Sequence, residues 1–211
     1  MARHTSTIAA ALTVSAALLL TACGGGSDDA SKDKIKGADK GPTGPSASAS
    51  SPAAPGVQRP AIKLPKGFQA DFEGWTNSDP ELQSVLNDGK ERLRATYAAI
   101  GDSNPKADYL AFYSTQAALA TGSEWVKGYK GLTITGKVTA YNPEVHLKGK
   151  KTATLFYCVD EGKGYSKNLK TGKLSGTPKG ESPKVRYSTG LGKTAEGIWQ
   201  TTTVESEAGG C

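Results

Sequence analysis

Cysteine and histidine are the most chemically versatile residues of this sequence, and both are scarce. The 211 residues contain three cysteines, Cys23, Cys158 and Cys211, and two histidines, His4 and His146. There is no histidine pair at ligand spacing, no Cys-x-x-Cys motif and no loop of spaced carboxylates that would bind calcium. The sequence therefore predicts no metal site and no cofactor, and it leaves little scope for histidine-based catalysis.

The first cysteine follows a segment typical of an export signal. Residues 1–7 carry Arg3 and no acidic residue, and residues 8–20 are an apolar run shorter than a membrane-spanning helix needs. The run ends in Leu20-Thr21-Ala22-Cys23, which resembles the bacterial lipobox, where signal peptidase II cuts before a diacylated cysteine. This resemblance implies a lipoprotein signal peptide over residues 1–22 and lipid attachment at Cys23. The alternative is an ordinary secretory signal that happens to contain a cysteine.

Lipid on Cys23 would determine where the protein works. Two or more acyl chains on one residue give stable anchoring, because each buried methylene contributes about 0.8 kcal/mol. The expected location is the outer face of the cell membrane, outside the cytoplasm, with the membrane as a partner through the lipid anchor.

The two remaining cysteines are expected to pair. Export places Cys158 and Cys211 in an oxidising compartment, where an even number of cysteines favours a disulfide. The bond would close a loop of about 54 residues and contribute roughly 4 kcal/mol to stability. The alternative is a nucleophilic Cys158, which would need His146 as its base because export removes His4 with the signal peptide.

The segment after Cys23 has the composition of a linker. From residue 24 to residue 66, 26 of 43 residues are Gly, Pro, Ser or Ala, and no aromatic residue occurs. Such a chain buries too little apolar surface to offset its ordering entropy. Residues 23–66 are therefore predicted to form a lipidated, disordered tether. It could be a spacer that holds the domain away from the membrane, or a linker whose length does not matter. Residues 67–211, which hold all 15 aromatic residues, form the predicted domain.

Basic residues are concentrated in the second half of this domain. Residues 127–193 contain 14 Lys or Arg and four Asp or Glu. A lysine-rich face could bind an anionic cell-wall polymer. Alternatively, the lysines protect the edges of a sheet from aggregation. Nucleic acid is not an expected partner, because an exported protein rarely meets it and no recognition motif is present.

The spacing of apolar residues divides the domain into helices followed by strands. Helical spacing predicts a long helix over residues 80–100 and a second from residue 105 to Gly122, followed by a connector that holds Trp125. A long polar loop or hairpin is expected over residues 162–183. Alternation predicts four antiparallel strands, centred on residues 132–140, 153–159, 185–191 and 198–204. Two helices followed by four strands indicate an α+β fold.

Three features of this pattern resemble the NTF2-like secreted lipoproteins of actinobacteria. They are Cys158-Val159-Asp160 on a middle strand, Gly197-Ile198-Trp199 at the last strand, and Cys211. The resemblance covers residues 80–211 and implies a cone in which N-terminal helices pack on a curved antiparallel sheet of about four strands. The long lysine-rich loop departs from the family pattern and leaves the pairing of the second and third strands open.

The same resemblance implies a pocket, since many members of the superfamily bind small molecules in the cone and a few are enzymes. By analogy, Tyr97, Tyr113, Trp125 and Tyr157 are placed near its mouth; the alternative is that they are core-packing residues. The expected function is that of a non-catalytic, membrane-anchored envelope lipoprotein that binds a small ligand or an envelope partner. The alternative is a small isomerase- or dehydratase-type enzyme with Asp160 as its base.

Overall fold

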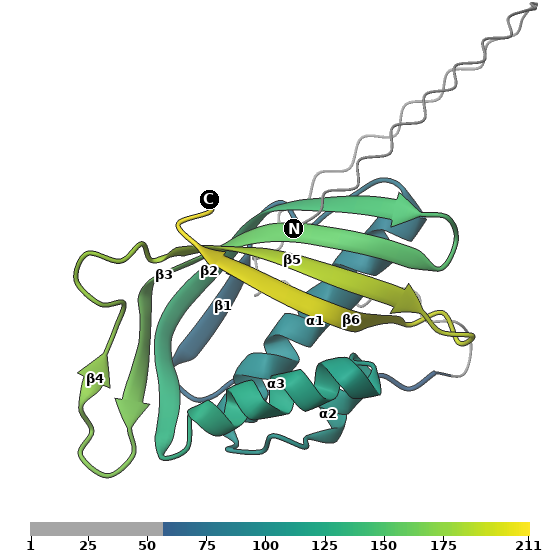
Figure 1. Ribbon diagram of the computed structural model, residues 1–211. Coiled ribbons are helices and arrows are strands. Elements are labelled where there is room, and N and C mark those ends of the chain that lie inside the picture. The colour runs from purple at the N-terminus through teal and green to yellow at the C-terminus, as the bar shows by residue number, and fades with distance from the viewer. Residues whose placement is uncertain (1–56) are drawn as a thin grey trace, which may run out of the picture. The chain divides into compact units, whose positions relative to one another are not determined.

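Three helices and six strands make up the part of the chain that the structure describes. This computed structural model describes residues 57–211, and the predicted signal peptide, Cys23 and tether residues 24–56 lie outside that range. Figure 1 shows the arrangement. The elements in chain order are β1 (Phe68–Phe72), α1 (Pro80–Gly101), α2 (Asp108–Phe112), α3 (Gln116–Gly128), β2 (Leu132–Lys148), β3 (Thr152–Asn168), β4 (Leu174–Ser175), β5 (Lys184–Lys193) and β6 (Trp199–Ala208).

The strands form one mixed sheet in the order β1-β2-β3-β5-β6, with β4 paired to β3. Strand β1 runs parallel to β2, and all other pairs are antiparallel. Register shifts in β2 next to Thr139 and Glu144 bend the sheet, and Figure 1 shows β2 and β3 curving beside the helices. The predicted α+β architecture, with N-terminal helices packed on a curved sheet, is confirmed.

The predicted strand count and direction need correction. The four predicted strands are the central parts of β2, β3, β5 and β6. Strand β1 was not predicted, although Phe68, Ala70 and Phe72 alternate with polar residues, because five residues give a weak signal. The sheet is therefore mixed and six-stranded.

Helix α1 forms where the sequence predicts it, for local reasons. The side chain of Asp79 accepts hydrogen bonds from the backbone N–H groups of Glu81 (2.8 Å) and Leu82 (3.1 Å), while Pro80 occupies the first turn. One face of the helix is buried against β2 and β6. This face fixes which α1 side chains can reach the interior.

The second predicted helix is divided and extends further than expected. Helix α2 ends before Tyr113, and α3 begins after Thr115, whose hydroxyl accepts from the backbone N–H of Ala118 at 3.4 Å. Gly122 lies inside α3 and does not end it. A Cβ at Gly122 would lie 2.9 Å from the Nη2 of Arg92, so α3 approaches the end of this α1 side chain closely at Gly122. Trp125 is consequently a helical residue rather than part of a connector.

The predicted polar loop over residues 162–183 is largely a hairpin. Strand β3 continues to Asn168, and β4 pairs back onto it. The side-chain oxygen of Asn168 accepts from the backbone N–H groups of Lys170 and Thr171, each at 3.0 Å, which forms the turn. Of the two interpretations, loop or hairpin, the structure supports the hairpin.

Packed structure begins before the predicted boundary at residue 67. Ile62, which the sequence places in the tether, is only 9% exposed, and its carbonyl accepts from Arg94 Nη2 at 3.2 Å. Gly101, at the end of α1, lies where a Cβ would come within 2.2 Å of the Cγ of Pro65. Residues 57–66 thus lie against α1, because a few specific contacts outweigh their linker-like composition.

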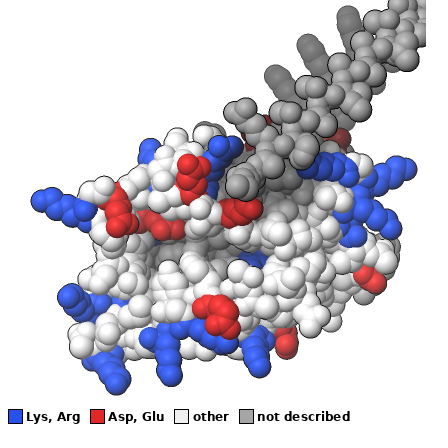
Figure 2. Space-filling view, in the orientation of Figure 1, with Lys and Arg blue, Asp and Glu red and all other residues white. Residues whose placement is uncertain are grey.

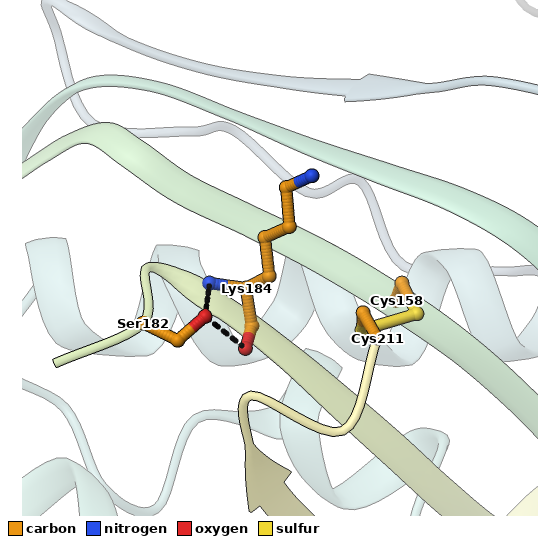
Figure 3. The surroundings of a disulfide bond; sticks show 4 residues. All are labelled: Cys158, Ser182, Lys184 and Cys211. Atoms are coloured by element: carbon orange, nitrogen blue, oxygen red, sulfur yellow. Dashed lines mark hydrogen bonds between the residues drawn. A yellow bond between two sulfur atoms is a disulfide. The ribbon is translucent and has the colours of Figure 1, made fainter.

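A disulfide joins Cys158 and Cys211, as the sequence predicts (Figure 3). After β6 the chain turns at Gly209, which has a φ of +76° and donates its N–H to the carbonyl of Lys184 at 2.7 Å. The last residues therefore cross β5 to reach β3. Because strand side chains alternate, Cys158 faces the opposite side of the sheet from its neighbour Tyr157. The bond consequently lies away from the helices.

Candidate functional site

A cavity of about 500 Å³ lies between the helices and the sheet. Its walls come from α1 and α3 on one side and from β3, β5 and β6 on the other. Figure 2 shows the surface hollowed between α3 and β6, with basic surface visible at the floor of the hollow. Its size is typical of a small-molecule site.

Arg92 of α1 lines this cavity and is only 8% exposed. Its Nε donates to the hydroxyl of Ser114 at 2.7 Å, and its Nη1 donates to the hydroxyl of Thr96. Its Nη2 has no hydrogen-bond partner among the described residues. Both partners of the guanidinium are thus neutral hydroxyls, and no carboxylate of the described residues pairs with it.

The charge of Arg92 persists despite its burial. Desolvation lowers the pKa of the guanidinium to about 10, which still leaves it protonated at neutral pH. Among the described residues that line the cavity, the acidic residue is Glu205, which is exposed and does not pair with Arg92. The cavity therefore contains an uncompensated positive charge.

Aromatic side chains form much of the remaining wall. Tyr97, Tyr157 and Tyr187 line the cavity, and the rings of Tyr157 and Tyr187 stack with centroids 5.2 Å apart. Burial raises the pKa of Tyr157 to about 12, so its phenol is neutral and polar at neutral pH. Trp125 also lines the cavity and is 46% exposed, which places it towards solvent. Such a wall suits a ligand with a planar apolar body.

A half-buried carboxylate lies beside the tyrosines. The hydroxyl of Tyr187 donates to Glu161 Oε1 at 3.5 Å. Desolvation raises the pKa of Glu161, against the opposing effect of the Tyr187 hydrogen bond. The pKa of Tyr97 is raised, first by burial and then by electrostatic interaction with Tyr187 and Glu161. Glu161 itself is not among the residues that line the cavity.

Three of the five predicted pocket residues, Tyr97, Trp125 and Tyr157, line the cavity, and the other two must be reassigned. Tyr113 is buried beyond the end of α2, and its hydroxyl accepts from Arg59 Nη1 at 3.4 Å. Asp160 lies three residues after Tyr157 on β3 and so faces the other side of the sheet. Its carboxylate accepts from the backbone N–H of Gly162 at 2.9 Å. Neither lines the cavity.

The sequence prediction did not include Arg92, although a signal was present. Asp88, Arg92 and Thr96 recur every four residues on the helix face that also carries Val85 and Ile100. Asp88 and Arg92 have the spacing of a surface ion pair. In the structure Asp88 instead binds Arg59. Arg92 is therefore left to face the cavity.

Metal ligands and membrane spans were sought among the described residues as well. Within residues 57–211, no group of three or more His, Cys, Asp or Glu side chains is placed to hold a metal ion. The helices of this same range lack the combined length and apolar character that crossing a membrane requires.

Solved structures of low sequence identity are similar to this chain. No protein-family model matches it, and no curated protein matches it. A ketosteroid isomerase-like protein from Erwinia carotovora atroseptica SCRI1043 is 14% identical, with 63% of this chain and 99% of that chain covered at a TM-score of 0.45. A nuclear transport factor 2 (NTF2-like) superfamily protein from Salmonella enterica serovar Typhimurium LT2 is 13% identical, with 59% and 91% covered at a TM-score of 0.41. At these values the likeness says nothing about activity, and the function has to be inferred from the cavity.

Proposed function

We propose that this protein is a membrane-anchored cell-envelope lipoprotein whose domain binds a small ligand, without catalysis, in the cavity between α3 and β6. The observation that carries this proposal is the cavity itself, with its buried polar groups and aromatic wall. A cavity of this size that combines apolar area with a few converging polar groups is the usual form of a small-molecule site.

The position of Asp160 favours binding over the alternative enzymatic function. An isomerase- or dehydratase-type enzyme with Asp160 as base needs that carboxylate within hydrogen-bond reach of a ligand in the cavity. Its carboxylate instead accepts from the N–H of Gly162, and Asp160 does not line the cavity. An enzyme acting in this cavity would therefore need a base other than Asp160.

The ligand-binding part of the proposal can be tested with naphthalene-2-carboxamide, a neutral planar probe. The full chain carrying Cys23→Ser, which removes the predicted lipid acceptor, is titrated by calorimetry. Ala117→Trp places a large side chain at the cavity and should abolish binding. Ala120→Trp is the matched control, because Ala120 is also exposed on α3 but does not line the cavity. Equal binding by both variants would contradict the proposal.

The anchoring part rests on the lipobox resemblance and has its own test. Cells that express the protein are fed an alkyne fatty acid, and the purified protein is assayed for label. Wild-type protein should be labelled and sediment with membranes, whereas Cys23→Ser should be neither labelled nor sedimented. Equal labelling of the two proteins would contradict the lipid anchor without affecting the cavity.

An anionic cell-wall polymer is a second candidate partner, favoured by the hairpin of β3 and β4. Lys163, Lys167, Lys170 and Lys173 lie on this hairpin, and all four are exposed. Figure 1 shows the hairpin extending away from the helices. Binding through these lysines predicts retention on a polyanionic polymer that falls steeply with salt. Retention independent of salt would remove this candidate.

A further inference from the structure

We propose that the ligand carries a carboxylate and that Arg92, assisted by Thr201, is the group that recognises it. This inference rests on the proposed ligand-binding function and adds the chemical class of the ligand. It starts from the guanidinium of Arg92, which lines the cavity with Nη2 unpartnered and with only hydroxyls on its other two nitrogens.

Burying a charge without a counter-charge is costly, because the low-dielectric interior replaces the water that would solvate it. The hydroxyls of Ser114 and Thr96 fix the guanidinium in place but cannot neutralise it. An anionic group in the cavity would provide the missing counter-charge. Arginine is suited to this role, since its planar donors match the two oxygens of a carboxylate.

Thr201 of β6 supplies a second, independent observation. It is fully buried and lines the cavity, and its side-chain hydroxyl has no hydrogen-bond partner among the described residues. Buried hydroxyls are normally satisfied, so an unpaired one in a cavity wall indicates a missing partner. The Thr201 hydroxyl can donate to a ligand oxygen.

Ser114 brings these two groups into the same part of the wall. Its backbone pairs with Thr201 in an isolated bridge, and its hydroxyl accepts from Arg92 Nε. Two donors, one charged and one neutral, match the two oxygens of a carboxylate. The planar apolar remainder of the ligand would then contact Tyr97 and Tyr157.

The test compares two probes of the same shape, naphthalene-2-carboxylate and naphthalene-2-carboxamide, on the full chain carrying Cys23→Ser. We expect the carboxylate to bind at least about tenfold more tightly. Arg92→Met should remove this preference by weakening binding of the carboxylate much more than binding of the carboxamide, and Arg92→Lys should restore part of it. Arg186→Met is the matched control, because Arg186 is exposed and lies over the ring of Phe156, which does not line the cavity. This control should leave the preference unchanged.

Each outcome has a separate meaning. Carboxamide binding without a carboxylate preference would overturn the role of Arg92 and leave the proposed cavity function standing. Failure of both probes to bind would overturn both. A preference that persists in Arg92→Met would also overturn the inference, and the unfolding transition of that variant shows whether it is folded. Thr201→Val should reduce the preference by a smaller factor than Arg92→Met does.

Discussion

The guanidinium of Arg59 donates to the carboxylate of Asp88, although the two residues are 29 positions apart in the chain. Asp88 is fully buried on α1, and its second oxygen accepts from the backbone N–H of Trp199 at 2.8 Å. Its pKa is raised by burial, against the opposing effects of Arg59 and Trp199. One carboxylate thus connects the segment before β1, the long helix and the start of β6.

Removal of Arg59 should destabilise the domain. Arg59→Met leaves the charge of Asp88 buried without its partner, so the free energy of unfolding should fall by about 3 kcal/mol. Adding Asp88→Asn should recover part of this loss, because the uncompensated charge is then removed. Urea denaturation of the full chain measures both effects.

Lys127→Met is the control for this prediction. Lys127 pairs with Glu124 on the surface of α3, where both side chains are largely exposed, so its loss should cost less than about 1 kcal/mol. Equal effects of Arg59→Met and Lys127→Met would show that residues 57–66 do not contribute to the folded domain.

The disulfide should account for a large part of the stability. Cys158 and Cys211 are 53 positions apart, and opening a loop of this size is expected to cost about 4 kcal/mol. The double variant Cys158→Ser, Cys211→Ser should therefore unfold at markedly lower denaturant concentration. A thiol assay on unreduced wild-type protein should detect neither cysteine; two free thiols would contradict the bond.

Alanine substitutions at two glycines with positive φ should distinguish the cost of backbone strain from the cost of a steric clash. Gly131 has a φ of +81° and open space around it, whereas a Cβ at Gly136 (φ +86°) would lie 2.2 Å from the backbone oxygen of Lys163. Gly131→Ala should cost about 1 kcal/mol from strain alone. Gly136→Ala should cost clearly more, because β2 and β3 must move apart. Equal losses in thermal denaturation would argue against this close approach.

Glu161 should make stability depend on pH. Its pKa is raised in the folded state by burial, so the folded protein binds the proton more tightly than the unfolded chain does. Stability should therefore fall as pH rises from the unfolded pKa of about 4.3 through the raised folded value. Glu161→Gln should be more stable than wild type at pH 7 and equal to it below about pH 4. A variant that is less stable than wild type at pH 7 would contradict this.

Periodicity predicted the elements that depend on their own sequence. Helix α1 was predicted from its own sequence, which includes the N-cap at Asp79. The centres of β2, β3, β5 and β6 were predicted from the alternation of apolar and polar residues within each strand. The missed features depend on distant contacts. The sequence predicts a helix end at Gly122, but Gly122 lies inside α3 beside Arg92 of α1. Ile62 has the sequence context of a linker, but it is buried in the core.

The candidate site follows the same division. Tyr97, Trp125 and Tyr157 were predicted from analogy with the fold, and all three line the cavity. Asp160 was assigned to the cavity wrongly, because successive strand residues face opposite sides of the sheet and Asp160 faces the side away from the cavity. Arg92 was missed because its spacing from Asp88 is that of an ordinary surface pair, and only Arg59, 33 positions before Arg92, removes Asp88 from it.

The most direct test of the account is a crystal structure of the Cys23→Ser chain with naphthalene-2-carboxylate. The account predicts the naphthalene ring between α3 and β6, beside Tyr97 and Tyr157. Its carboxylate should lie about 3 Å from Arg92 Nη2. A probe bound only outside the cavity, or inside it with its carboxylate turned away from Arg92, would contradict the account.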